Sequence, residues 1–221
     1  MITLTAPPDT IIETGYTRRP VTSAVVIVLS ALVVGILTSF GHEFLPSPLS
    51  SVANSAGAWT VITYGAIYLV RSGPLAAALL GAVAFVLMNE TYALVSGWRG
   101  FPYFDGLGNQ WNIVGVLIGP IVGTAAAWVR SPVLARVIWA AAAPAAVLVG
   151  EGIYGLTLIA SSTSPVYWVA QIIAGGVIVA AITAVKLRDL RLTLITYALT
   201  LALAGLVVLV YALVPRILFG F

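Results

Sequence analysis

Charged residues are scarce in this chain: Asp, Glu, Lys and Arg make up 8% of its 221 residues, whereas hydrophobic residues make up 61%. Soluble domains have about 25% charged residues, so this sequence lacks the side chains needed to cover a water-facing surface. Cysteine is absent, which excludes disulfides, thiolate chemistry and Cys-ligated metals. The chain has 1 histidine, so a metal site has little support. No basic stretch alternates with aromatic residues, and nucleic-acid binding has no support either.

Sequence patterns of catalysis are also missing. The chain has no His-Glu-x-x-His pair, no Gly-x-Ser-x-Gly turn and no aspartate pair within its apolar segments. We therefore expect that the protein is not an enzyme and holds no cofactor. It also has no phosphate-binding loop, so active transport would require a separate motor subunit or an ion gradient.

Most of the chain consists of long apolar segments. A helix that crosses a membrane needs about 20 consecutive apolar residues. These segments predict an all-α membrane bundle of about seven spans in one domain, residues 20–221, preceded by a flexible cytoplasmic tail, residues 1–19. The predicted spans are 21–40, 52–70, 74–96, 111–129, 135–160, 165–185 and 191–213.

Lysine and arginine predict the orientation, because cytoplasmic loops carry an excess of both. With the N-terminus inside and the C-terminus outside, eight lie on the cytoplasmic side: Arg18, Arg19, Arg71, Arg130, Arg136, Lys186, Arg188 and Arg191. Two lie outside, Arg99 and Arg216. We expect a multi-pass protein of the plasma (inner) membrane.

Small residues predict how the helices associate, since helices in lipid attract one another through close backbone contact. Gly115, Gly119 and Gly123 recur every four residues on one face of the fourth span. We predict that another helix lies against this face, either within the chain or from a partner subunit.

Two carboxylates within the spans are the strongest functional signal, because a charge at mid-bilayer costs at least ~2.5–3.5 kcal/mol. At 1.5 Å per residue, Glu90 and Glu151 both lie ~9–14 Å below the outer helix ends. We predict one outward-opening pocket around them and expect at least one to be protonated or paired with a cation, Arg99 being the nearest candidate in sequence. Its candidate ligand-binding residues are Glu90, Glu151, Tyr154, Gln171, Asn89, Asn112, Trp59 and Arg99.

Glu151 stands between Gly150 and Gly152, which suggests a loosened helix with exposed carbonyl groups. Glu151 either holds a cation, a proton or a donor group, or is protonated and bonded to a neighbouring helix. The outer loop 97–110 is rich in aromatic residues. It is either a lid over the pocket or part of an interfacial aromatic belt.

Three stretches, residues 47–59, 150–157 and 163–168, resemble the signature stretches of a family of small actinobacterial integral membrane proteins of unknown function. This resemblance implies a helical membrane protein and no particular activity. In size, hydropathy and predicted pocket, the chain is also similar to substrate-capture (S) components of energy-coupling-factor importers, although those usually have six spans.

The leading functional hypothesis is a membrane protein that binds or transports a small neutral or cationic molecule from the outer face. Trp59, Trp98 or Trp111 would offer cation–π contact to such a ligand. The alternative is a non-catalytic accessory or structural subunit of a larger membrane complex.

Overall fold

The computed structural model describes residues 20–101 and 109–219, without the side chains of residue 110 and residues 214–219. The part of the chain described contains helices and no strand. The predicted tail, residues 1–19, and the middle of the outer loop, residues 102–108, lie outside the described residues. The helices are α1 (Pro20–Phe44), η1 (Ser47–Asn54), α2 (Ala56–Val70), α3 (Pro74–Trp98), α4 (Gln110–Trp128), α5 (Leu134–Thr157), α6 (Pro165–Ile182), η2 (Thr183–Leu187) and α7 (Leu190–Phe219).

Six helices are long and apolar enough to cross a membrane, namely α1, α3, α4, α5, α6 and α7. The second predicted span, residues 52–70, is different. Its helix α2 has 15 residues and is about 22 Å long, which is less than the roughly 30 Å of the hydrocarbon layer. The 3₁₀ helix η1 occupies the preceding polar stretch. The count of seven spans therefore stays a prediction, and α2 is a short helix that begins inside the bundle.

Local sequence explains where α2 and α3 meet. Arg71 ends α2 in the left-handed conformation, with φ 55°, and Pro74 stands in the first turn of α3, where its missing N–H group needs no partner. The predicted break at residues 71–75 is confirmed. It directs α3 back along α2.

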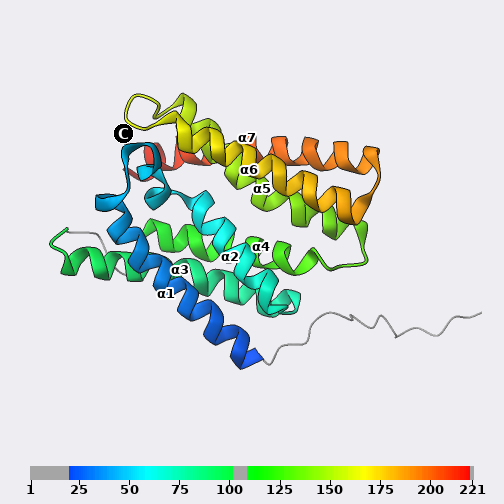
Figure 1. The fold of residues 1–221 in the computed structure, drawn as a ribbon, viewed down its shortest axis with the longest axis horizontal. Helices are drawn as coiled ribbons and strands as arrows, with labels where there is room; N and C mark the ends of the chain where they lie inside the picture. Colours follow the sequence, from blue (N-terminus) through cyan, green and yellow to red (C-terminus); the bar gives the residue numbers. More distant parts are fainter. Residues whose placement is uncertain (1–19, 102–108, 220–221) are drawn as a thin grey trace, which may run out of the picture.

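The helices form two units, and α2 lies between them (Figure 1). In the first unit α3 packs against α1 and α4, and in the second unit α5 packs against α6 and α7. Helix α2 contacts α1, α3 and α4 of the first unit and α5 of the second. The start of α2 is therefore placed where both units can reach it.

Glycines allow the helices of the first unit to approach closely. A methyl group added at Gly119 would lie 2.6 Å from the main-chain nitrogen of Ala82, and one at Gly115 would lie 2.9 Å from Cβ of Phe85. At Gly123 it would meet the carbonyl group of Ala77. The predicted contact between this glycine face and another helix is confirmed, and the partner is α3.

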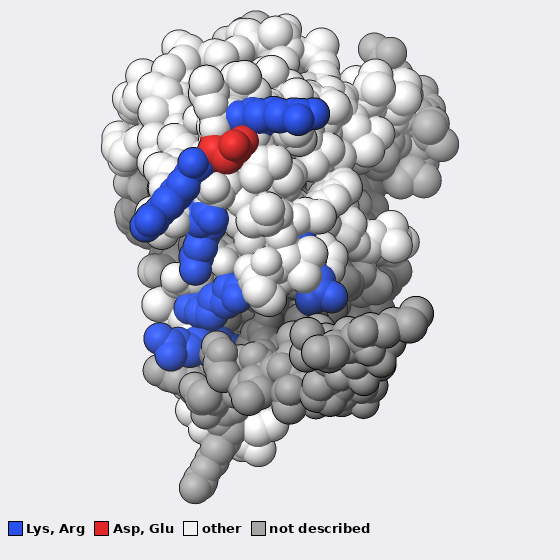
Figure 2. Space-filling model, turned by 90° about the vertical axis from the view of Figure 1, so that its right-hand side faces the viewer, with Lys and Arg blue, Asp and Glu red and all other residues white. Residues whose placement is uncertain are grey.

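Most lysines and arginines of the described residues lie at one end of the bundle, where α2 joins α3, α4 joins α5 and α6 joins α7 (Figures 1 and 2). They are Arg71, Arg130, Arg136, Lys186, Arg188 and Arg191. Helix α1 begins toward this end and α7 ends at the opposite one (Figure 1). The described residues thus separate charge as the sequence predicts, and which end faces the cytoplasm stays a prediction.

Proline 144 interrupts the hydrogen bonds inside α5, and α2 compensates for it. Proline has no N–H group, so the carbonyl group of Ala140, four residues earlier, loses its helical donor. The hydroxyl group of Tyr64 on α2 donates to that carbonyl at 2.9 Å. The middle of α2 is thereby fixed to the first half of α5.

We expect Tyr64→Phe to lower the free energy of unfolding in detergent by about 1–2 kcal/mol, because it leaves a buried carbonyl group without a donor. In a Pro144→Ala background the same substitution is expected to cost close to nothing, since Ala at residue 144 supplies the missing N–H group. A double-mutant cycle on chemical denaturation measures this coupling. Equal costs in both backgrounds would show that the Tyr64 hydroxyl group does not replace the lost helical donor.

Candidate functional site

The carboxylate of Glu151 lies at the centre of a buried polar cluster. Glu151 is 2% exposed and stands on α5, at a place where α6, α7 and the start of α2 all contact its side chain. Five donors face its two oxygens. They are Ser55 Oγ at 2.6 Å, Gly57 N at 2.7 Å, Gln171 Nε2 at 2.7 Å, Ala56 N at 3.0 Å and Tyr211 Oη at 3.2 Å.

The start of α2 explains why a carboxylate is needed here. The first N–H groups of a helix have no partner within the helix, and in a membrane interior each unsatisfied group costs several kcal/mol. Ser55 is the N-cap and accepts from Ala58 N at 3.2 Å. Glu151 accepts from Ala56 N and Gly57 N, and its negative charge also suits the positive end of the helix dipole.

A second group of contacts surrounds the carboxylate. The hydroxyl group of Tyr167 on α6 donates to Ser55 Oγ at 2.7 Å. Gln171 places its Oε1 atom 3.1 Å from Ser55 Oγ, and its Nε2 atom also donates to the carbonyl group of Leu148 at 3.2 Å. Tyr154 packs against Tyr211, with 5.1 Å between ring centroids. The cluster therefore joins α2 to all three helices of the second unit.

Glycines fit this part of α5 between its neighbours. A methyl group at Gly150 would lie 2.7 Å from the carbonyl oxygen of Ala204 on α7, and one at Gly152 would lie 2.5 Å from a side-chain carbon of Ile172 on α6. Helix α5 continues through both residues to Thr157. The prediction of a loosened helix was wrong: these glycines serve close packing.

Glu90 belongs to a different group of polar contacts. It is half-buried and accepts a hydrogen bond from Asn112 Nδ2, while Asn89 Nδ2 donates to Asn112 Oδ1 at 3.0 Å. This group joins α3 to α4 and shares no residue with the hydrogen bonds described around Glu151. A groove of about 340 Å³ adjoins it, lined by Val86, Asn112, Ile113, Val116 and Leu117.

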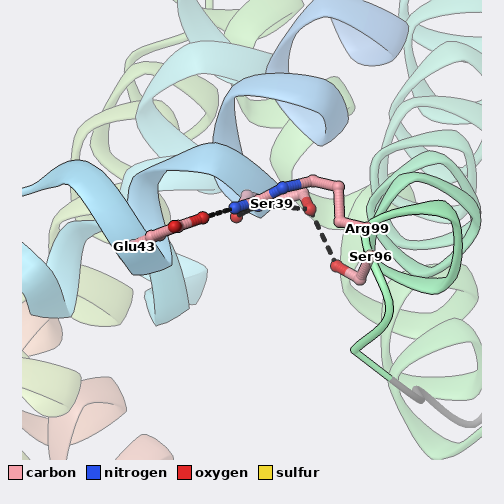
Figure 3. Close-up of polar contacts among 4 residues, drawn as sticks. All are labelled: Ser39, Glu43, Ser96 and Arg99. Atoms are coloured by element: carbon pink, nitrogen blue, oxygen red, sulfur yellow. Dashed lines mark hydrogen bonds and ion pairs between the residues drawn. The ribbon is translucent and has the colours of Figure 1, made fainter.

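Arg99 pairs with neither of the two candidate carboxylates. It forms an ion pair with Glu43 and donates to the carbonyl oxygen and the hydroxyl group of Ser39 (Figure 3). Its guanidinium carbon lies 4.3 Å from the ring centroid of Phe40. The candidate pairing of Arg99 with one of these carboxylates is not found, because the C-terminal ends of α1 and α3 lie together and Glu43 takes the guanidinium group.

The predicted site residues thus fall into separate places. The structure brings Glu151 and Gln171 into contact, and Tyr154 reaches them through Tyr211. Trp59 lies elsewhere and donates to Thr38 Oγ1 on α1 at 3.2 Å. Trp98 and Trp111 are exposed. Whether any of these residues binds a ligand stays a prediction.

Sequence reasoning missed Ser55, Gly57, Tyr167 and Tyr211. A signal was present for two of them. Ser55 follows the polar stretch 47–54 and precedes an apolar helix, as an N-cap serine does. Tyr167 stands four residues before Gln171, and this spacing places both on one helix face.

The fold and the buried cluster define a multi-pass helical membrane protein in which the short helix α2 is held between two units. The chain belongs to DUF6518, a family of unknown function, whose profile matches residues 14–217. The resemblance to an uncharacterised family is confirmed at that level. No curated protein and no solved structure matches the chain.

Proposed function

We propose that the protein binds or transports a small solute across its membrane, and that the solute site lies at the start of α2 beside Glu151. The observation that supports this proposal is a buried carboxylate bonded to the first N–H groups of a helix that begins inside the bundle. Helices that begin within the membrane build the solute sites of many secondary transporters, where their N-terminal ends face acceptor groups. In this protein the carboxylate of Glu151 occupies the place at the N-terminal end of α2 that a solute would take.

The donors around Glu151 favour one kind of solute. A carboxylate offers about four lone-pair directions, and five donors already face it, so a cation would find little free acceptor capacity. A solute that presents acceptor oxygens, such as a carboxylate or a hydroxyl group, would use the same donors once Glu151 withdrew. The sequence favours a small neutral or cationic ligand. We therefore propose, in its place, a small neutral or anionic solute that bears acceptor oxygens.

The direction of uptake depends on the orientation of the chain, and we propose that the end rich in lysine and arginine faces the cytoplasm. The N-terminus would then be inside and the C-terminus outside. Reporters fused at residue 10 and after Phe221 are expected to report opposite sides of the membrane. Reporters on the same side would refute both the orientation and the odd number of crossings.

The test of function compares purified variants in detergent against panels of small carboxylates, polyols and amines. A solute at a hundredfold excess over its Kd stabilises a protein by about 2.7 kcal/mol, so binding should raise the unfolding midpoint of the wild type. We expect the carboxylate or polyol panel to do so. Glu151→Gln should strengthen the effect, because a neutral side chain releases the donors to the solute, and Glu90→Gln, in the other polar group, should match the wild type.

Uptake of the same radiolabelled solute into proteoliposomes then separates transport from binding. No stabilisation and no uptake from any panel would overturn the proposal. A membrane protein that co-purifies in fixed stoichiometry would in that case support the alternative, an accessory subunit. Stabilisation by amines alone would retain a binding function and refute the donor argument.

A further inference from the structure

Glu151 is surrounded by neutral donors in the described part of the bundle. Its hydrogen-bond partners there are the hydroxyl groups of Ser55 and Tyr211, the amide of Gln171 and two main-chain N–H groups. The ion pair described in the structure lies elsewhere, between Arg99 and Glu43. The charge on Glu151 is therefore stabilised by hydrogen bonds and the α2 dipole, and adding a proton would change all of these interactions together.

We propose that Glu151 is a proton-binding site, and that its protonation releases the start of α2, together with η1, from the second unit. Glu151 belongs to the cluster proposed above as the solute site. The release of α2 does not require a solute, and only its link to transport rests on the proposed function. In that setting, the proton is the coupling ion that frees the donors for the solute.

The energetic reason is that hydrogen bonds to an ionised group are roughly twice as strong as those between neutral groups. Protonation removes the charge and turns one acceptor position into a donor. Because five donors already face the carboxylate, the added O–H group has no acceptor among them at that position. The bonds from Ala56 N and Gly57 N weaken together, and so does the favourable interaction with the helix dipole. The closed arrangement therefore holds while Glu151 is ionised and is lost as the pH falls.

Packing determines which part moves. Close contacts at Gly150, Gly152 and Gly155 hold α5 against α6 and α7, so the second unit stays together. The start of α2 is held to it by polar contacts, and its apolar contacts lie further along the helix, with Ile67 and Val70 in the core of the first unit. Loss of the polar contacts therefore frees the start of α2 and the side of η1 that packs against α6, while the contact between Ala53 of η1 and Gly41 of α1 keeps η1 on the first unit.

A hydrogen-bonded route reaches the carboxylate from the edge of the cluster. Tyr167 is half-buried, and its hydroxyl group donates to Ser55 Oγ, which donates to Glu151 Oε2. A hydronium ion at Tyr167 gives up its proton and becomes water, Tyr167 and Ser55 each pass one proton on, and the carboxylate becomes a carboxyl group. The titratable groups that face Glu151 are Tyr167 on α6 and Tyr211 on α7, with Tyr154 on α5 behind Tyr211. Helix α2 and η1 contribute Ser55 and main-chain groups.

Single cysteines test the release directly, because the natural chain has none. Ser51 in η1 is 8% exposed, and η1 packs against α6, so maleimide should label Ser51→Cys when the start of α2 and η1 leave the second unit. Ser161→Cys, at an exposed position between α5 and α6, corrects for the effect of pH on thiol reactivity. Ala126→Cys, at a residue 0% exposed in the first unit, reports general unfolding.

We expect the labelling of Ser51→Cys relative to Ser161→Cys to rise as the pH falls, by up to about tenfold per pH unit for one proton. Labelling of Ala126→Cys should stay low throughout. With Glu151→Gln added, the relative labelling should be high at every pH, whereas Glu90→Gln should leave the wild-type profile unchanged.

A pH-independent ratio with Glu151 intact would overturn the proposal, and this measurement does not depend on whether Glu151→Gln folds. A rise that persists unchanged in Glu151→Gln would also overturn it, since the proton would then bind elsewhere. The experiment uses no solute, so its failure is distinguishable from failure of the proposed function.

Discussion

Glu151→Ala is expected to lower the free energy of unfolding in detergent by roughly 3–5 kcal/mol, because each buried donor left without an acceptor costs about 1–3 kcal/mol. The carboxylate accepts from five donors, and two of them are main-chain N–H groups that cannot turn toward another partner. Alanine leaves all five without that acceptor in a buried site. The cost is therefore the desolvation of several groups at once, in addition to the lost packing of the side chain.

Matched variants show whether the network explains this loss. Tyr211→Phe removes one donor and keeps the ring, so we expect a cost of about 1 kcal/mol. Glu151→Gln keeps the shape and one acceptor oxygen, so its cost should fall between the two. Chemical denaturation followed by tryptophan fluorescence measures all three. A cost for Glu151→Ala no larger than that for Tyr211→Phe would mean that water replaces the carboxylate and that the start of α2 is already wet.

The burial of Glu151 was predictable from the sequence, whereas its partners were not. A carboxylate that deep in an apolar segment must face polar groups within the protein. Ser55 and Gln171, however, lie 96 and 20 residues from it along the chain. Apolar spans give little information about which of their faces meet. Few residues of α6 and α7 face the cluster, namely Tyr167 and Gln171 on α6 and Tyr211 on α7. They stand within otherwise apolar helices, so neither helix shows an extended polar face.

The glycines illustrate the same limit. The spacing of Gly115, Gly119 and Gly123 predicts one helix face, and the structure confirms it. Gly150 and Gly152 differ by two residues, which in a helix places them on nearly opposite sides. They meet α7 and α6 respectively. From the sequence alone, glycines that let α5 pack closely on two sides could not be distinguished from glycines that loosen the helix.

The short helix α2 links the fold to the proposed function. Among the described residues, hydrogen bonds link α2 to α5 at two places: the Tyr64 hydroxyl group donates to the carbonyl of Ala140, and the first N–H groups of α2 donate to Glu151. The Tyr64 contact is between neutral groups, whereas the contact at Glu151 depends on a charge. Under the proposal, protonation weakens the contact at Glu151 and leaves the Tyr64 contact in place, so that α2 would pivot about its middle.

Gly119→Leu is expected to destabilise the detergent-solubilised protein by roughly 3 kcal/mol, at the upper end of overpacking costs. A methyl group at Gly119 would already lie 2.6 Å from main-chain atoms of Gly81 and Ala82. Backbone atoms cannot turn aside as a side chain can, so α3 and α4 must separate along their shared face. Gly205→Leu on α7 is the matched control, because nothing lies within 4 Å of its added Cβ atom. The control should unfold at nearly the wild-type midpoint. Equal midpoints for the two variants would show that the α3–α4 contact does not limit the stability of the bundle.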